Sequence, residues 1–243
     1  MKLTSALLLV LSAALGALPT DSLCDQAAYL LFNRHLEEGH LDSAYSLLAQ
    51  GRAQDPAHEH CLYLWSRIHV QKGDNAEAKS DKFAYYQKAR SIADTLKELN
   101  PKNPYGHMWW AVAQGRIGQT RGVLNSLFMV PSLKKAFSLA LELDSAHTTA
   151  YDAYGVLYYE LPGIFGGSLA KSEEYLKAGL EIDPEYTVLR LDLAKVYIKQ
   201  KRWQEAREQL IELVATTDPT FPADFVLDDR PEALDLLEQL EDR

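Results

Sequence analysis

A dipeptide, Asp-Pro or Asn-Pro, returns along the chain at nearly regular intervals and constrains the fold more than any other feature. The repeats of this signal begin at Asp55, Asn100, Asp183 and Asp218, and Asp144-Ser145 stands where a further one is expected. The intervals between these five positions are 45, 44, 39 and 35 residues. Repetition with a period of about 20–50 residues indicates stacked supersecondary units rather than one globular core. Stacked units present an extended concave face, so a binding protein or scaffold is expected before an enzyme.

Each repeated unit has the pattern of two antiparallel helices. In the last complete unit the first helix is marked by Leu193, Ala194 and Tyr197, and the second by Ala206, Leu210 and Leu213. Small residues on both helices let the two backbones approach closely. Proline after the second helix ends it, because proline lacks an N–H and clashes with the preceding turn. A terminal helix from Pro231 to Leu240 is expected to cover the exposed apolar end.

Three stretches make the middle units longer than the last one. The second helix of the second unit is expected to run from about Ala76 to Leu99, and insertions are expected over residues 118–131 and 161–167. Both insertions are apolar, and an apolar loop does not lie open to water without a reason. One interpretation is that they pack on each other and on neighbouring helices. The other is a lid or rim beside the groove that includes Phe128, Met129, Ile164 and Phe165.

The N-terminus predicts export. Lys2 precedes an apolar run from Ala6 to Leu18 that contains small residues near its end. This pattern is typical of a secretory signal peptide, here residues 1–20, followed by a helical-repeat domain over residues 21–243. The run is shorter than the roughly 20 residues of a membrane-spanning helix, and a membrane anchor of marginal length is the alternative. The expected location is periplasmic or secreted.

Cys24 and Cys61 are the two cysteines of the chain. In an exported protein such a pair indicates a disulfide. Neighbouring parallel helices, however, hold their backbones about 8–10 Å apart, whereas a disulfide needs Cα atoms within about 7 Å. Two buried thiols are therefore the alternative.

Composition and motifs argue against several functions. The formal net charge of −9 disfavours binding to nucleic acid, because an acidic surface repels phosphates. The sequence holds no glycine-rich phosphate loop, nucleophile elbow or zinc-protease helix, so no catalytic residues and no cofactor are predicted.

Two histidine-containing stretches are candidates for further chemistry. His58-Glu59-His60-Cys61 resembles part of a metal site, but a structural zinc takes four ligands at recognisable spacing and no second pair follows. A polar turn between units is the preferred interpretation, and no metal is predicted. His107, close to Trp109 and Trp110, is interpreted as a hydrogen-bonded packing residue rather than a catalytic one.

A groove is predicted along the first helices of the units. If these helices line the concave face, residues at i, i+3 or i+4 and i+7 point toward it. The predicted groove residues are Tyr29, Asn33, Tyr63, Arg67, Tyr105, Met108, Val112, Asp152, Tyr159, Leu191 and Lys195. This mostly apolar and aromatic set suits a peptide groove or ligand cleft. A register error of one residue would instead bury these side chains between helices. Asn33 and Arg67 alone do not make a carboxylate clamp, so a more apolar partner is expected.

The helix pairs with small residues and closing prolines resemble tetratricopeptide repeats over roughly residues 22–219. The resemblance implies an all-α fold: a right-handed superhelical solenoid of antiparallel helix pairs, with about five units and a C-terminal capping helix.

A second resemblance is narrower. Gly106-His107-Met108-Trp109-Trp110-Ala111, together with Leu161-Pro162-Gly163 and Gly166-Gly167, is similar to exported bacterial tetratricopeptide proteins such as the T-component of TRAP transporters. That family implies a periplasmic helical protein with a hydrophobic cavity. The expected function is a non-enzymatic periplasmic scaffold that binds a protein or peptide in its groove within an envelope or transport assembly. The alternative is a carrier of a small hydrophobic ligand in a TRAP-type system, and any membrane association would be indirect.

Overall fold

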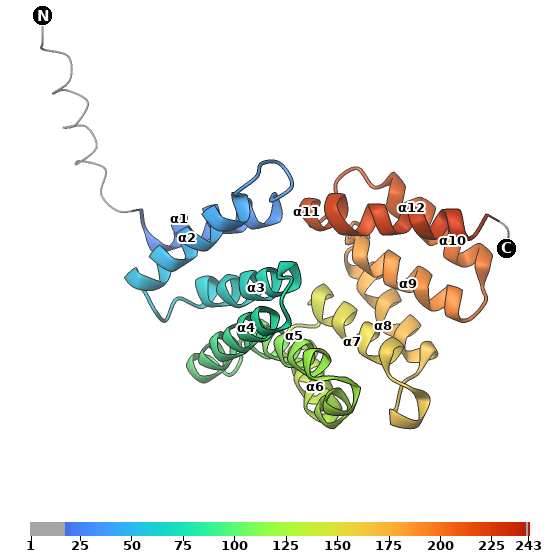
Figure 1. Ribbon diagram of the computed structural model, residues 1–243, viewed down its shortest axis with the longest axis horizontal. Helices are drawn as coiled ribbons and strands as arrows, with labels where there is room; N and C mark the ends of the chain where they lie inside the picture. The colour runs from blue at the N-terminus through green and yellow to red at the C-terminus, as the bar shows by residue number, and fades with distance from the viewer. Residues whose placement is uncertain (1–17, 242) are drawn as a thin grey trace, which may run out of the picture.

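The computed structural model describes residues 18–241 and 243, except the side chains of residues 123–125, and within this part it contains helices and no strand (Figure 1). Ten helices form the repeats: α1 (Thr20–Phe32), α2 (His40–Gln54), α3 (Glu59–Asn75), α4 (Lys79–Leu99), α5 (Pro104–Arg121), α6 (Val123–Leu143), α7 (Thr148–Glu160), α8 (Leu169–Ile182), α9 (Thr187–Lys199) and α10 (Trp203–Ala215). The chain ends with α11 (Pro222–Asp224), a π-helical turn η2 (Phe225–Asp229) and α12 (Arg230–Gln239). The predicted helical solenoid is confirmed, with five helix pairs and a terminal helix.

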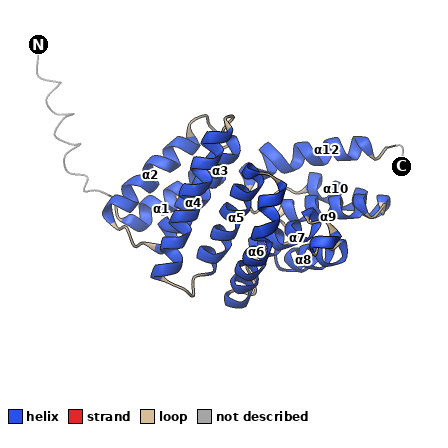
Figure 2. Ribbon diagram, turned by 60° about the horizontal axis from the view of Figure 1, so that its bottom comes forward, coloured by secondary structure: helices blue, strands red, loops and turns tan. Residues whose placement is uncertain are grey.

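The two helices of each pair lie side by side (Figure 2). Ala44, Ala89 and Ala206, on the second helices of three pairs, are fully buried. An alanine at such a position lets the two helix backbones approach, which a larger side chain would prevent. Alanine therefore sets the close spacing inside the pairs, as the sequence pattern predicts.

The repeated Asp or Asn residue ends the second helix of a pair by a defined turn. The Oδ1 atoms of Asp55, Asn100, Asp144 and Asp183 each accept a hydrogen bond of 3.0–3.1 Å from the backbone N–H two residues later. This Asx turn supplies a local partner for the backbone where the helix stops. Asp144 makes the same turn without a following proline, so the acidic or amide side chain is the essential part of the signal.

The expected insertion at residues 118–131 is not a loop. α5 continues to Arg121, the chain turns at Gly122, and α6 then runs through Pro131 to Leu143. Gly122 has φ +104°, a backbone conformation that glycine adopts without strain. The extra residues therefore lengthen a helical hairpin.

The second insertion is a loop between α7 and α8 that holds the short 3-10 turn η1 (Gly163–Phe165). A Cβ atom at Gly167 would lie 1.7 Å from the carbonyl oxygen of Leu161, so only glycine fits where the loop closes on itself.

A disulfide joins α1 to α3. Cys24 and Cys61 are bonded, with their Cα atoms 5.4 Å apart, and neither side chain is exposed. The alternative of two separate buried thiols is therefore wrong. Both cysteines lie near the starts of their helices, where the two backbones come within bridging distance. α2 packs closely against this disulfide, because Gly51 has no side chain to collide with the two sulfur atoms.

The C-terminal segment returns to the first helix pair and closes the solenoid into a ring (Figure 1). Arg34 forms ion pairs with Asp224 at 2.6 Å and Asp228 at 3.1 Å, and the rings of Phe32 and Phe221 lie 5.2 Å apart. We call these contacts the clasp.

The proposed signal peptide falls largely outside the described residues, which begin at Leu18. Among the described helices, none combines the length and apolar character needed to cross a membrane.

Candidate binding groove

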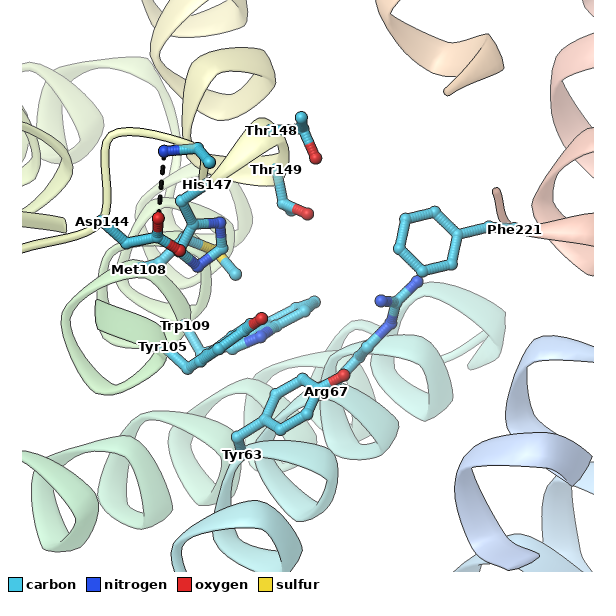
Figure 3. Close-up of a pocket in the computed structure, with 11 residues that line it drawn as sticks. Tyr63, Arg67, Tyr105, Met108, Trp109, Asp144, His147, Thr148, Thr149 and Phe221 are labelled. Carbon is cyan, nitrogen blue, oxygen red and sulfur yellow. Dashed lines mark hydrogen bonds between the residues drawn. The ribbon is translucent and has the colours of Figure 1, made fainter. Parts of the chain in front are cut away.

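The first helices of the pairs, α1, α3, α5, α7 and α9, are called the inner helices. Among them, α3, α5 and the start of α7 form a hollow of about 130 Å³ beside the C-terminal segment (Figure 3). We call it the small hollow. It is lined by Tyr63, Arg67, Tyr105, Met108, Trp109, Asp144, Ala146, His147, Thr148, Thr149 and Phe221. The first four belong to the groove predicted from the sequence, and they come from α3 and α5. The structure therefore brings four of the predicted groove residues together at one hollow.

Aromatic rings cross the small hollow from one inner helix to the next. The ring centroids of Tyr63 and Tyr105 are 4.5 Å apart, and those of Tyr105 and His147 are 4.6 Å apart. Burial raises the pKa of both tyrosines and lowers the pKa of His147, so all three rings are neutral near pH 7. This wall offers flat apolar faces and uncharged hydrogen-bonding groups.

Two buried ring nitrogens of the small hollow lack a hydrogen-bond partner in the described part of the chain. They are Nε1 of Trp109 and Nε2 of His147, on side chains that are more than nine-tenths buried. The indole N–H is a donor, and the neutral imidazole nitrogen is a donor or an acceptor according to its tautomer. Because an unsatisfied buried polar group costs free energy, each such atom in a native protein calls for an explanation.

Arg67 carries the positive charge of the small hollow, but the clasp uses it. Its guanidinium carbon lies 4.3 Å from the ring centre of Phe221 and 4.5 Å from that of Phe32, and its Nη2 is 3.2 Å from Asp224. Stacking between two rings and an ion pair fix this side chain. Arg67 therefore connects the hollow to the ends of the solenoid rather than presenting a free cation.

A second opening of about 600 Å³, the large cavity, lies farther along the same inner helices. It extends between α5, α6, α7, the start of the α7–α8 loop and α9. Its apolar wall includes Val112, Leu127, Met129, Leu133, Phe137, Val156, Leu157, Leu161 and Val188. The charged residues at its surface are Arg116, Asp152, Glu160 and Asp192. Both insertions noted in the sequence thus contribute to this cavity.

Two carboxyl groups from neighbouring inner helices meet in the large cavity. Asp152 of α7 hydrogen-bonds Asp192 of α9, and burial, together with the nearby Asp192, raises the pKa of Asp152 well above its usual range. Burial also raises the pKa of Asp192, although Lys195 lies 3.1 Å from that carboxylate and opposes the shift. The Oδ1 atom of Asp152 is buried and has no hydrogen-bond partner in the described residues.

The other predicted groove residues lie at varied depths. Val112 and Asp152 line the large cavity, and Lys195 forms an ion pair with Asp192, which also lines it. Tyr29 is 59% exposed on α1, and the side chain of Asn33 donates to the carbonyl of Tyr29. Tyr159 lies beneath the ammonium group of Lys199, which is 4.1 Å from its ring centre. None of these last three lines either opening.

Met108 and Leu191, predicted to face the groove openly, are buried, with 1% and 2% of their surface exposed. Leu191 belongs to the C-terminal core, and its neighbour Asp192 reaches the cavity instead. The register error of one residue that the sequence left open is therefore present in the fifth unit.

Of the predicted rim residues, only Met129 lines the large cavity. Phe128, Ile164 and Phe165 are 85%, 87% and 47% exposed. The missed groove residues include Trp109, His147, Phe221 and Asp192. A signal for Asp192 was present, because it occupies nearly the same place in its unit as Asp152.

The histidine-containing stretches have structural partners. Cys24, His58 and Cys61 form a group of possible ligand atoms within 4.8 Å of one another, but the disulfide uses both sulfur atoms. Glu59 accepts hydrogen bonds from Asn100 and Asn103. His107 is buried and donates from Nε2 to the carbonyl of Pro101 at 2.8 Å, which agrees with its interpretation as a packing residue.

Comparison with known families finds a match over most of the solenoid. The model of the family described as regulator of microtubule dynamics protein 1-3 matches residues 25–164, which is more than half of the chain. The chain belongs to this family. A tetratricopeptide-repeat model matches residues 167–222, so the predicted repeat type is confirmed. The similarity to the TRAP T-component is not shown and stays a prediction.

A curated relative is regulator of microtubule dynamics protein 1 of Bos taurus, 26% identical over 208 residues. The match covers 77% of this chain and 62% of the bovine protein, so this chain spans less than two thirds of its relative.

Solved structures agree on the fold. A thermophilic tetratricopeptide protein of Thermus thermophilus has a TM-score of 0.65 and 18% identity, covering 88% of this chain and 99% of that one. PilF of Pseudomonas aeruginosa has a TM-score of 0.53 and 14% identity, covering 92% of both chains.

Proposed function

We propose that this protein is a non-enzymatic binding module that receives a peptide segment of a protein partner on the inner face of the ring. The small hollow and the large cavity follow one another along α5 and α7, so one extended segment can contact both. Tetratricopeptide folds are generally used as protein-binding scaffolds, and the function of this one depends on its particular groove.

The observation that carries this proposal is the pair of unpartnered ring nitrogens in the small hollow. Within the described residues, Trp109 Nε1 and His147 Nε2 lie among aromatic rings, where a peptide can supply both apolar contact and hydrogen-bonding groups. A peptide backbone carries one donor and one acceptor at nearly every residue, which matches the hydrogen-bonding capacity of the two rings.

We also propose that the protein works after export. The apolar N-terminal run supports this location, and so does the bridge between Cys24 and Cys61, since disulfides persist in oxidising compartments. An exported protein meets partners other than microtubules. The bovine relative is named for the regulation of microtubule dynamics, and we propose that the partner of this chain is a different protein.

A second candidate function is the carriage of a small hydrophobic ligand. The large cavity supports it, because about 600 Å³ with a mainly apolar wall is within the size range of small-molecule sites. Native mass spectrometry of protein isolated from its own cells separates the two candidates: a retained organic molecule supports the carrier, and its absence together with peptide binding supports the module.

Peptide binding is tested with a displayed library of random 12-residue peptides selected against the intact protein. Enriched peptides are synthesised, and their affinities are measured by isothermal titration calorimetry. Trp109→Phe removes the unpartnered N–H, so affinity is expected to fall by about three- to tenfold.

The matched control is Trp65→Phe. Trp65 is equally buried and its Nε1 atom also lacks a partner among the described residues, but it lines neither opening. The proposal fails if no peptide is enriched, or if the two variants weaken peptide binding equally.

A further inference from the structure

We infer that the large cavity selects a basic side chain, lysine or arginine, carried on an apolar stretch of the partner peptide. This inference deepens the proposed function and rests on it. It assigns the chemistry of the partner residue and names Asp152 and Asp192 as the groups that recognise it.

The shape and lining of the cavity suit such a side chain. Lysine and arginine carry long apolar stems that pack along hydrophobic surface while the charged head reaches a polar group. Val112, Val156 and Val188 supply apolar surface from three different helices, and Asp152 and Asp192 lie on two of the same helices. Residues flanking the basic one in the peptide would cover the rest of the wall, including Met129 and Leu161.

The acidic end of the cavity is short of positive charge. Lys195 contacts Asp192 at 3.1 Å, but it also pairs with Glu232 at 2.9 Å. Asp229 and Asp224 lie on the C-terminal segment nearby, and Asp224 is already paired with Arg34 and Arg67. Arg116, the cation on the cavity surface, pairs with Asp74 at 3.3 Å. Across the described part of the chain, none of these cations forms an ion pair with Asp152.

Asp152 therefore has a buried oxygen that no described residue satisfies, next to a second carboxyl group. Two carboxyl groups so close together in a poorly solvated site favour a cation between them or a shared proton. A charge-assisted hydrogen bond from an ammonium or guanidinium group satisfies the free oxygen and offsets the repulsion. An anionic group would add to the repulsion, and an aliphatic one would leave the oxygen unsatisfied.

The test is a double-mutant cycle between protein and peptide. The probe is the tightest 12-residue peptide from the selection described above, made with its basic residue and with norleucine in its place. On the wild-type protein, norleucine is expected to weaken binding by about tenfold or more, as for loss of a charge-assisted hydrogen bond. On the Asp152→Asn protein, replacing the basic peptide residue by norleucine is expected to weaken binding by less than about threefold, because the carboxylate that the basic residue pairs with is gone.

Stability gives a second readout of the same variant. Asp152→Asn replaces a carboxyl group that faces Asp192 by a neutral amide of the same shape, so its melting temperature is expected to equal or exceed that of the wild type while the affinity for the basic peptide falls. A purely structural role for Asp152 would lower the melting temperature and leave the cycle without coupling. Asp218→Asn is the matched control, since Asp218 is exposed and lies outside both openings.

The outcomes separate this inference from the function on which it rests. Peptides that bind in a Trp109-dependent way but lack a basic residue, or show no coupling to Asp152, overturn the inference and leave the binding module intact. A selection that yields no peptide overturns both. A basic residue whose contribution disappears in Asp152→Asn supports both.

Discussion

Asp229 is a carboxyl group that the fold buries next to a hydroxyl. Thr187 donates a hydrogen bond of 2.6 Å to its Oδ2 atom, and the side chain is almost inaccessible to water. Burial raises the pKa of Asp229 to about 7 despite that hydrogen bond, and the nearby Asp224, Asp192 and Asp228 add to the shift. The folded protein therefore holds the proton of Asp229 up to near-neutral pH.

The pH dependence of stability follows from this shift. In the unfolded chain an aspartate loses its proton near pH 4. Between about pH 4 and 7 the folded state binds more protons at this site than the unfolded state, so the site's contribution to the free energy of unfolding falls as pH rises. That contribution is fully present below about pH 4 and lost above about pH 7.

Asp229→Asn is accordingly predicted to be more stable than the wild type at pH 8, by about 2–4 kcal/mol, and equally stable at pH 4. Asparagine keeps an oxygen that accepts from Thr187 and removes the charge. Urea unfolding at the two pH values measures the difference, with Asp218→Asn as an exposed control. A variant that is less stable than the wild type at both pH values contradicts the prediction.

Individual groove residues were only partly predictable from the sequence. Tyr63, Tyr105 and Val112 follow from helical periodicity, because their helices begin close to the repeated Asx turns. Leu191 was predicted to face the groove but is buried, and Asp192 lines the large cavity instead. A register error of one residue corresponds to a turn of about 100° around the helix, which brings a different side chain to the groove. Phe221 could not be found by periodicity, because it reaches the hollow through long-range folding of the C-terminal segment.

At the scale of helices and turns, the sequence was more informative. The Asx turns after α2, α4, α6 and α8 explain why the repeat signal predicted the ends of these helices. The hairpin of α5 and α6 was missed because Gly118, Gly122 and Pro131 suggest a loop. Glycine is tolerated in α5, and Pro131 lies well inside α6, so composition alone did not reveal the helices.

The disulfide between α1 and α3 leads to a prediction about local stability. It closes a segment with a sequence separation of 37 residues, so replacing both cysteines by alanine is expected to destabilise the N-terminal unit by about 3–4 kcal/mol. In a solenoid each unit contacts mainly its neighbours, so the effect should remain close to α1 and α2.

Hydrogen exchange measures this difference helix by helix. The double variant is expected to lose protection in α1 and α2 and to keep it in α9 and α10. Uniform loss of protection along the chain, or two free thiols in the unreduced wild-type protein, would contradict the prediction.

At the scale of the whole molecule, the clasp gives the solenoid a closed form. The side chain of Arg34 is largely buried where it pairs with Asp224, and Arg67 joins the same carboxylate from the small hollow. These contacts connect residues more than 150 positions apart in the sequence. A ring closed in this way holds α3, α5 and α7 in fixed positions around the inner face, which lowers the cost of ordering them when a peptide binds.

The five helix pairs could be predicted from local signals, whereas the closed ring could not. A repeat pattern records contacts between adjacent units. Contacts between the first unit and the C-terminal segment depend on the accumulated curvature of all five pairs, which no local pattern contains. The same curvature positions the small hollow against Phe221.

Hydrogen exchange of the protein with and without a selected peptide tests whether the inner face of the ring binds a peptide. We predict added protection in α5, α7 and α9, where the small hollow and the large cavity lie, and little change in α4, α8 and α10, which are second helices of pairs. Protection confined to α4, α8 and α10, with α5, α7 and α9 unchanged, would contradict it.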